Sequence, residues 1–260
     1  MTMRTTLIAA LAVVLVLAVA LTGCSKQEES KAPVEITPGL SYVDSMIGQG
    51  VEVQSDDFVM VHYTGWLSVD GEKGEQFDSS VERGEPIGFP LGRSFVIQGW
   101  EKGLPGMKVG GKRTLIIDPD MGYGEQGRPP VIPPSSTLIF DVEIVDVPKV
   151  DVEVLTEGTG PAAELGDNIS VDYTGWVWKD GAKGEEFDSS ANAGRPYSFT
   201  LGARMVIPGW DLAMEGLKVG TKARLIIPPV LAYGKRGSGP KIPPEATLCF
   251  EVELMEITGK

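Results

Sequence analysis

The chain carries the same sequence motifs twice, at a constant offset of 110 residues. YTGW occupies positions 63–66 and 173–176, and GEQFDSS at 74–80 corresponds to GEEFDSS at 184–190. Between Val61 and Phe140 the two copies align without a gap, and about half of the aligned positions are identical. Repeat units of solenoid proteins are about 20 to 50 residues long, so a longer unit that occurs twice indicates two duplicated domains.

Each copy consists mainly of segments that are typical of β-strands. Apolar side chains at positions 138, 140, 142 and 144 share one face while Asp141 and Glu143 share the other, which is the pattern of an antiparallel strand with one buried face. A short helix is expected after the Val-Ile pair of each copy, and Pro208 fits the first turn of the second helix. Each copy therefore predicts a sheet packed on one small helix. Further strands are expected at 58–63, 114–117, 169–173 and 223–227, and from residue 150 onward.

The first residues have the composition of a leader. An uninterrupted apolar run at 7–21 follows Arg4 and is shorter than the roughly 20 residues of a membrane-spanning helix, so it predicts a signal peptide. The run ends in LTGC, which resembles a bacterial lipobox and predicts lipidation of Cys24; an ordinary signal peptide with a chance cysteine is the alternative. We expect a lipoprotein signal peptide over 1–23, a polar tether over 24–39, and domains over 40–147 and 148–260.

Composition and motifs exclude several classes of function. The formal net charge is -13 and no cluster of Lys and Arg occurs, which argues against a nucleic-acid surface. His62 is the single histidine, and Asp172 stands at its position in the second copy, so a histidine-based nucleophilic site is not duplicated. No HExxH or CxxC motif occurs, and we expect no metal site. Acylation of Cys24 would leave Cys249 alone, as a small packing residue.

Several ordered motifs together resemble one known family. VHYTGWL, FDSS, PLGRSFVIQGWEKGL, GYG and VIPPSSTLIFDVE are similar in order and spacing to the FKBP-type peptidyl-prolyl cis-trans isomerases, the macrolide-binding immunophilins. The resemblance covers nearly all of the chain after the tether, in two copies. It implies an α+β fold in which a twisted antiparallel sheet wraps around one short helix, with an apolar pocket between them.

The resemblance also implies the residues of a pocket in each copy. Any one of these aromatic residues alone is typical of a core, but the complete ordered set favours a site. The first copy would use Tyr63, Phe77, Asp78, Ile97, Trp100, Tyr123 and Phe140 as catalytic residues, with Val96, Ile132 and Ile87 also binding substrate. The second would use Tyr173, Phe187, Asp188, Ile207, Trp210, Tyr233 and Phe250, with Val206, Ile242 and Tyr197.

The two copies depart from the family pattern at two places. Ile87 stands where the family usually has an aromatic residue, as at Tyr197, so we expect the first pocket to be shallower or differently shaped. Both copies also have extra residues between the tyrosine and the Phe-Asp pair, and we expect these to lengthen a hairpin or to form a bulge.

The resemblance implies isomerisation of X-Pro bonds, by a pocket that needs no cofactor and no metal. The twisted amide of the transition state has less charge separation than the planar amide, so a dry aromatic pocket would favour it. The expected partners are proline-containing exported polypeptides, macrolide inhibitors and, through the lipid anchor, a membrane, with no nucleic acid. The expected location is extracytoplasmic. A non-catalytic peptide-binding chaperone that uses the same pockets is the alternative, and an anchored scaffold with large exposed apolar patches is a weaker third reading.

Overall fold

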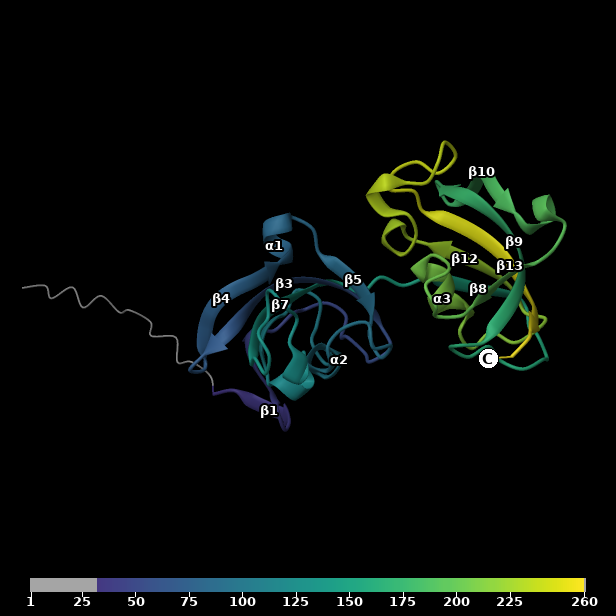
Figure 1. Cartoon of the computed structure of the whole chain (residues 1–260). Helices are drawn as coiled ribbons and strands as arrows, with labels where there is room; N and C mark the ends of the chain where they lie inside the picture. The colour runs from purple at the N-terminus through teal and green to yellow at the C-terminus, as the bar shows by residue number, and fades with distance from the viewer. Residues whose placement is uncertain (1–31, 260) are drawn as a thin grey trace, which may run out of the picture. The chain divides into compact units, whose positions relative to one another are not determined.

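The computed structural model describes residues 32–259, which form two antiparallel sheets (Figure 1). The predicted leader, Cys24 and the beginning of the predicted tether lie outside these residues. The first sheet has the order β1-β2-β6-β7-β3-β4, and β5 also pairs with β3. Its strands are β1 (Val34–Thr37), β2 (Leu40–Met46), β3 (Phe58–Val69), β4 (Glu72–Ser79), β5 (Ile87–Pro90), β6 (Lys112–Ile117) and β7 (Leu138–Asp146).

The second sheet repeats this topology. Its order is β10-β9-β13-β12-β8, and β11 pairs with β9. Each strand of the second sheet therefore has a counterpart in the first. Among residues 32–259, strand β1 of the first sheet has no counterpart in the second. Its strands are β8 (Asp151–Thr156), β9 (Asn168–Lys179), β10 (Ala182–Ser189), β11 (Tyr197–Thr200), β12 (Lys222–Ile227) and β13 (Leu248–Ile257). The duplication predicted from the motifs is therefore seen as two sheets of the same topology.

Short helices complete each copy. The expected helix after the Val-Ile pair is α2 (Gln98–Gly103) in the first copy and α3 (Pro208–Met214) in the second, where Pro208 lies in the first turn as expected. A further helix, α1 (Ser80–Arg83), follows β4 and was not expected. Single 3-10 turns are η1 (Pro119–Met121), η2 (Gly124–Gln126), η3 (Ser190–Ala193), η4 (Pro229–Leu231) and η5 (Gly234–Arg236).

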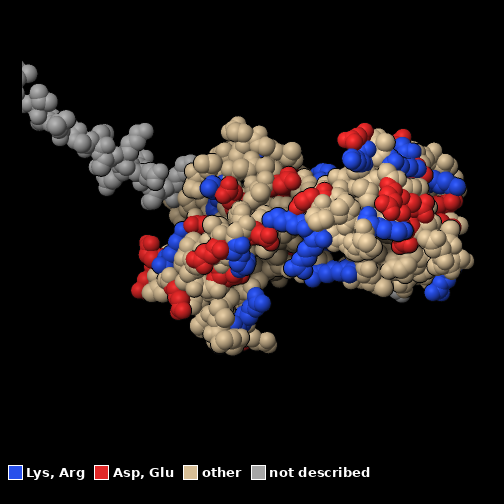
Figure 2. Space-filling view, turned by 90° about the horizontal axis from the view of Figure 1, so that it is seen from above, with Lys and Arg blue, Asp and Glu red and all other residues tan. Residues whose placement is uncertain are grey.

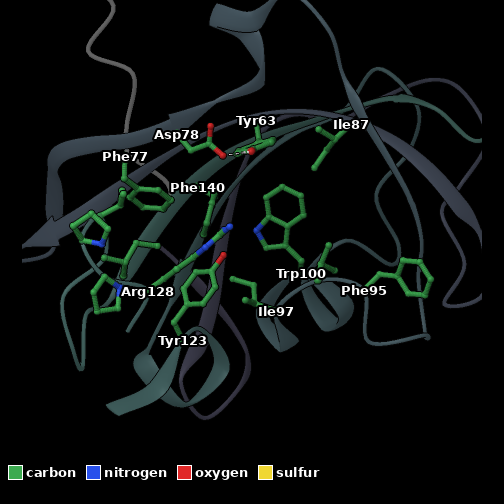
Figure 3. Close-up of a pocket in the computed structure, with 15 residues that line it drawn as sticks. Tyr63, Phe77, Asp78, Ile87, Phe95, Ile97, Trp100, Tyr123, Arg128 and Phe140 are labelled. Atoms are coloured by element: carbon green, nitrogen blue, oxygen red, sulfur yellow. Dashed lines mark hydrogen bonds between the residues drawn. The ribbon is translucent and has the colours of Figure 1, made fainter. Parts of the chain in front are cut away.

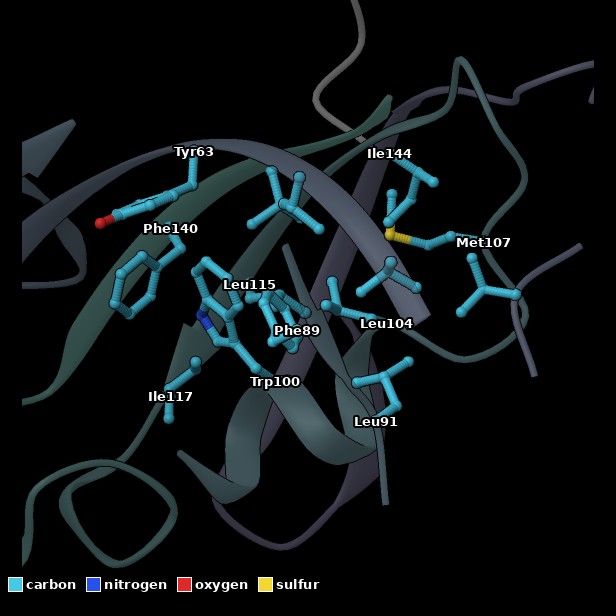
Figure 4. Close-up of a cluster of buried hydrophobic side chains, with 14 of the residues drawn as sticks. Tyr63, Phe89, Leu91, Trp100, Leu104, Met107, Leu115, Ile117, Phe140 and Ile144 are labelled. Carbon is cyan, nitrogen blue, oxygen red and sulfur yellow. The ribbon is translucent and has the colours of Figure 1, made fainter. Parts of the chain in front are cut away.

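The central helix packs on the concave face of its sheet (Figure 4). Trp100 and Leu104 of this region are buried against Leu115 and Ile117 of β6. A Cβ atom added at Gly99 would lie 2.6 Å from Ile117, and one at Gly209 would lie 2.4 Å from the corresponding isoleucine of β12. Glycine at this position therefore lets the helix lie directly on the sheet, and the expected fold class, a sheet wrapped around a short helix, is confirmed.

The expected strands are present and several are longer than expected. In β7 the predicted apolar face is buried, and Cys249 on β13 is also fully buried. The extra residues form a longer hairpin between β3 and β4, which turns at Asp70 and Gly71 with φ values of +52° and +86°. Two positive φ values are typical of a type I′ hairpin turn. The pairing of β3 with β4 shifts register on both sides of Trp66, so the hairpin contains the expected bulge as well.

Strand β1 lies inside the segment whose composition predicts a tether. Its residues pair with β2, with Val34 opposite Tyr42 and Glu35 opposite Ser41. Most of its side chains are exposed, so its backbone hydrogen bonds rather than a buried apolar face hold it in place. A prediction based on apolar periodicity misses such a strand.

Charged side chains of both signs are interspersed with uncharged ones on the face shown in Figure 2. Lys and Arg side chains lie beside Asp and Glu side chains over much of the face shown in Figure 2. Within the first copy, Lys73 pairs with Asp141 at 2.6 Å and Lys112 with Glu143 at 3.0 Å. Between residues 32 and 259, no helix has the length and apolar character needed to cross a membrane.

Candidate functional site: a ring-lined cavity in each copy

The first copy contains a cavity of about 500 Å³ between the sheet, the start of α2 and the segment before β7 (Figure 3). All of the first-copy residues predicted for the pocket line it: Tyr63, Phe77, Asp78, Ile87, Val96, Ile97, Trp100, Tyr123, Ile132 and Phe140. It is also lined by residues that the sequence did not single out, namely Phe95, Arg128, Pro129, Pro130 and Val131. The predicted set therefore comes together in space, although its parts are far apart in the sequence.

Trp100 forms the floor of this cavity. Its ring meets Tyr63 at a centroid distance of 5.1 Å and an angle of 80°, and Phe140 at 5.2 Å and 84°. Phe77 contacts Phe140 in the same way, at 5.5 Å and 87°. Edge-to-face contacts of this kind are favourable because the ring edge is positive and the ring face negative. They hold the rings at fixed angles, so the walls of the cavity are formed before a ligand binds.

The second copy repeats this ring arrangement. Trp210 meets Tyr173 at 5.1 Å and 82° and Phe250 at 5.2 Å and 83°. Phe187 contacts Phe250 at 5.4 Å and 84°. The two sets of centroid distances therefore agree to within 0.1 Å pair by pair.

The glycine of YTGW makes room for the rings. A Cβ atom added at Gly65 would lie 2.6 Å from the Phe77 ring and 2.7 Å from the Phe140 ring. At Gly175 the corresponding distances are 2.6 Å and 2.8 Å. No side chain fits at this position while the rings keep their places, which explains why the motif contains glycine in both copies.

The serines of FDSS fix the strand that carries the tyrosine. The Ser80 hydroxyl accepts a hydrogen bond of 2.7 Å from the backbone N–H of Tyr63, and Ser190 accepts one of 3.1 Å from that of Tyr173. Ser79 accepts a hydrogen bond of 3.3 Å from Glu82 at the start of α1 and so caps this helix. The motif therefore positions the tyrosine in addition to supplying Phe77 and Asp78.

Asp78 lies in a hydrogen-bonded group at the rim of the first cavity. The Tyr63 hydroxyl donates to its carboxylate, Arg83 forms an ion pair with it, and the Arg83 guanidinium also donates to the Tyr63 hydroxyl at 3.0 Å. Burial alone would raise the pKa of Asp78, but the hydrogen bonds from Tyr63 and Arg83 outweigh it and hold this pKa below its ordinary value. Burial and the bond to Asp78 raise the pKa of Tyr63, so the phenol is neutral and the carboxylate charged at neutral pH.

The second copy has the same pair without the guanidinium. The Tyr173 hydroxyl donates to Asp188 at 2.6 Å, and the backbone N–H of Ser189 donates to the same carboxylate at 2.8 Å. Ala193 stands at the position of Arg83. Burial, followed by the bond to Asp188, raises the pKa of Tyr173. Sequence comparison of the copies gave no signal for Arg83, because it occurs in one of them alone.

The cavity of the second copy is smaller, at about 230 Å³. Tyr197 lines it and lies 6.4 Å from the Tyr173 ring and 6.5 Å from the Trp210 ring, whereas Ile87 stands at this position in the first copy. The predicted residues that line the second cavity are Tyr173, Phe187, Asp188, Tyr197, Val206, Ile207, Trp210, Tyr233 and Phe250. Ile242 is not among them and is buried in the core of its copy. The two cavities thus differ in volume and in this lining residue, and the one with isoleucine is the larger.

Residues with hydrogen-bond donors line each cavity. Ile97 and Ile207 directly precede α2 and α3, so their N–H groups lie before the first turn, where a helix offers no carbonyl to them. The Tyr123 hydroxyl points into the first cavity in Figure 3. The indole nitrogens of Trp100 and Trp210 are buried and have no hydrogen-bond partner among residues 32–259. Donors in an apolar cleft are suited to orient the carbonyl groups of a ligand.

Comparisons with known proteins agree with these observations. A family model described as FKBP-type peptidyl-prolyl cis-trans isomerase matches residues 49–145 and 160–255. The human peptidyl-prolyl cis-trans isomerase FKBP10 is 39% identical over 212 residues, which are 79% of this chain and 35% of that protein, so the chain spans about a third of its length. A probable FKBP-type isomerase of Haemophilus influenzae is 52% identical over 109 residues, 42% of this chain and 43% of that protein. The solved structure of FkpA from Escherichia coli is 43% identical, with a TM-score of 0.41, over 46% of this chain and 53% of that chain.

Proposed function

Because this chain belongs to the FKBP-type peptidyl-prolyl cis-trans isomerase family, we propose that it catalyses rotation about X-Pro bonds at two sites, one in each ring-lined cavity. The observation that carries the proposal is the preformed cage of Trp100, Tyr63 and Phe140 with a charged Asp78 at its rim, repeated around Trp210. A proline ring is flat and apolar, and the cage offers it an indole face with aromatic walls.

The cage is suited to this reaction because rotation needs no covalent chemistry. Twisting an amide must break its resonance, with a barrier of roughly 18 to 20 kcal/mol, so the uncatalysed change takes about 10 to 100 s. The planar amide is strongly dipolar and is stabilised by water. A cavity that replaces this water by aromatic rings stabilises the twisted amide relative to the planar one.

Each residue of the first site has a proposed role. Trp100 supports the proline ring, and Tyr63, Phe77 and Phe140 exclude water from it. The N–H of Ile97 and the hydroxyl of Tyr123 hold substrate carbonyls, while Asp78 faces the twisted amide and orients Tyr63. The corresponding residues of the second site are Tyr173, Phe187, Asp188, Ile207, Trp210, Tyr233 and Phe250.

The test is isomerisation of a short X-Pro peptide by the chain from Ser25 onward, with Asp78→Ala, Asp188→Ala and the double variant. A stepwise loss of catalysis supports two working sites, and loss with one substitution alone assigns catalysis to one copy. A folded wild-type chain that binds the peptide without accelerating isomerisation would instead support a peptide-binding chaperone.

The two copies are proposed to fold and act independently, as domains over residues 40–147 and 148–260. Because β1 pairs with β2, a fragment that tests the first domain should begin before Val34. We expect each isolated domain to be folded and active. A folded domain without activity would remove that copy from the proposal.

The proposed location is extracytoplasmic, with the chain anchored to a membrane through lipidated Cys24 and acting on exported proline-containing polypeptides. The apolar run at 7–21 and the LTGC motif support this proposal. One acyl chain binds a membrane only marginally, so a stable anchor requires more than one. In bacteria that express the chain, Cys24→Ser should abolish labelling by radioactive palmitate and release the protein from the membrane fraction. Labelling that persists in this variant would contradict the anchor.

A macrolide that occupies the cavities should stabilise the protein. A ligand that binds the folded state alone raises stability by about 2.7 kcal/mol at a free concentration of 100 times Kd. We expect a higher Tm at saturating macrolide, and a smaller rise in the Trp100→Ala variant. An unchanged Tm would show that neither cavity accepts the ligand.

A further inference from the structure

Arg128 extends from the loop before β7 into the first cavity (Figure 3). Two backbone hydrogen bonds join Arg128 to Ile132. The N–H of Arg128 donates to the carbonyl oxygen of Ile132 at 2.8 Å, and the N–H of Ile132 donates to the carbonyl oxygen of Arg128 at 3.0 Å. The guanidinium lies 6.0 Å from the centre of the Tyr123 ring. A hydrogen-bonded loop therefore presents a positive charge to the first cavity.

The charge of Arg128 is not balanced by a neighbouring acid. Arg83 also lies at this rim, but it forms an ion pair with Asp78, so the charges of these two groups cancel. Among residues 32–259, no carboxylate lies within ion-pair distance of Arg128. The chain as a whole carries a formal net charge of -13, so the excess positive charge at this cavity is a local property.

The second copy does not share this feature. Ser238 stands at the position of Arg128, and none of residues 238–242 lines the second cavity. The cation of this loop, Lys241, donates instead to the carbonyl oxygens of Glu186 and Phe187, at 3.4 Å each. The two copies therefore have the same aromatic rings around the cavity, but only the first has the charge of an arginine from this loop at its cavity.

We propose that Arg128 determines the specificity of the first site, by selecting peptides that carry a carboxylate side chain next to the proline. This inference rests on the proposed function of the site. An arginine fork binds a carboxylate by two parallel hydrogen bonds, and a peptide whose proline lies over Trp100 places the neighbouring side chain at the rim, where Arg128 lies. The second site, with serine at this position, does not select for this charge.

The expected effect is moderate because Arg128 is exposed. Ion pairs at exposed sites are weakened by water and by salt, so we expect a preference of about twofold to fivefold for a carboxylate over its neutral isostere. The preference should decrease as salt is added, because the Debye length falls from about 10 Å at 0.1 M to about 3 Å at 1 M. A purely steric role of Arg128 has no such dependence.

The experiment compares kcat/KM for peptides with Glu and with Gln immediately before the proline, and a second pair with Glu and Gln immediately after it. The full chain is used with Asp188→Ala, so that the first site dominates the signal. In this background Arg128→Ser gives the first site the residue of the second copy, and Arg128→Lys keeps the charge. Dissociation constants of the same peptides are measured by calorimetry.

We expect the Glu/Gln ratio of kcat/KM for at least one peptide pair to fall to about one in Arg128→Ser and to remain above one in Arg128→Lys. In the Asp188→Ala chain that retains Arg128, the ratio should decrease as salt is added. Equal changes for the Glu and Gln peptides in Arg128→Ser would show that Arg128 merely occupies space, and would overturn the inference. Binding that depends on Arg128 without any catalysis would keep the inference and overturn the isomerase function. Catalysis with no difference between the Glu and Gln peptides would support the isomerase function and overturn the inference about Arg128.

Discussion

The Tyr173 hydroxyl donates a hydrogen bond of 2.6 Å to the carboxylate of Asp188, in a group that contains no arginine because Ala193 stands where the first copy has Arg83. The equivalent pair, Tyr63 and Asp78, shares its rim with the Arg83 guanidinium. Two sites with the same ring cage thus place their carboxylates in different electrostatic surroundings. The difference makes Arg83 the natural first target for a test.

Removing Arg83 should raise the pKa of Asp78. In the folded protein this pKa is lowered, so the ionised carboxylate stabilises the fold above the ordinary value of about 3.9, and this contribution is lost as the pH falls through the lowered value. Arg83→Ala should move the pKa upward and so move this loss to higher pH. The measurement is an NMR titration of the side-chain carboxyl carbon of Asp78.

The control is Lys73→Ala, which removes a cation that pairs with Asp141 at 2.6 Å. It should leave the titration of Asp78 unchanged. If Asp78 titrates at the same pH with and without Arg83, the hydrogen bond from Tyr63 suffices to lower its pKa. The stability effect should be small, since the Asp78 side chain is 41% exposed.

Phe77→Ala should reduce catalysis more than it reduces stability, because Phe77 lines the cavity and is half-buried. The matched control is Phe89→Ala, which removes a buried ring that does not line this cavity. Truncating a buried phenylalanine costs about 3 to 5 kcal/mol, and we expect a smaller loss at Phe77. Urea unfolding and peptide isomerisation should be measured for both variants. Phe187→Ala and Phe199→Ala form the same comparison in the second copy. If Phe77→Ala or Phe187→Ala lowered stability as much as catalysis, that result would contradict the placement of these rings in the cavity wall.

Gly65→Ala should destabilise the first copy by about 1 to 3 kcal/mol, since its methyl group would overlap the Phe77 and Phe140 rings. A smaller side chain at position 77 should relieve part of the overlap. In a double-mutant cycle, Gly65→Ala combined with Phe77→Leu should therefore lose less stability than the sum of the single changes. Strict additivity would mean that the methyl group is accommodated elsewhere.

Cys249 should resist alkylation in the folded protein. It is fully buried on β13, and burial raises the pKa of its thiol, so little reactive thiolate is present near neutral pH. Iodoacetamide labelling, located by peptide mapping, should remain low in buffer and become complete in urea. Rapid modification under native conditions would show that β13 opens readily.

The ring cage was predictable from the sequence, and the charged groups around it were not. Tyr63, Phe77, Trp100 and Phe140 recur at equal spacing in the second copy, so comparison of the copies identifies them. Arg83 and Arg128 correspond to Ala193 and Ser238, and a comparison that seeks identity passes over them. Their part in the site follows from hydrogen bonds and cavity lining, which depend on the folded backbone.

The strands show a similar division. β7 was predictable because its buried face alternates with polar side chains. Most residues of β1 and half of those of β4 are exposed, and neither strand has this alternation. Their backbone pairing is set by neighbours that are distant in the sequence or by the turn at Gly71. A role assigned to a residue in one copy does not always hold for its counterpart in the other. Ile132 and Ile242 are both buried, but Ile132 lines the first cavity and Ile242 does not line the second.

The close approach of Gly65 to two rings also bears on how the duplicated halves could diverge. A methyl group fits at this glycine in neither copy, so an acceptable change there requires changes in the rings as well. Arg128 and Ser238 are exposed, so a replacement there does not require the rings of the cage to change. After duplication, mutation could therefore alter the rims of the two cavities one residue at a time while the cage beneath them stayed the same.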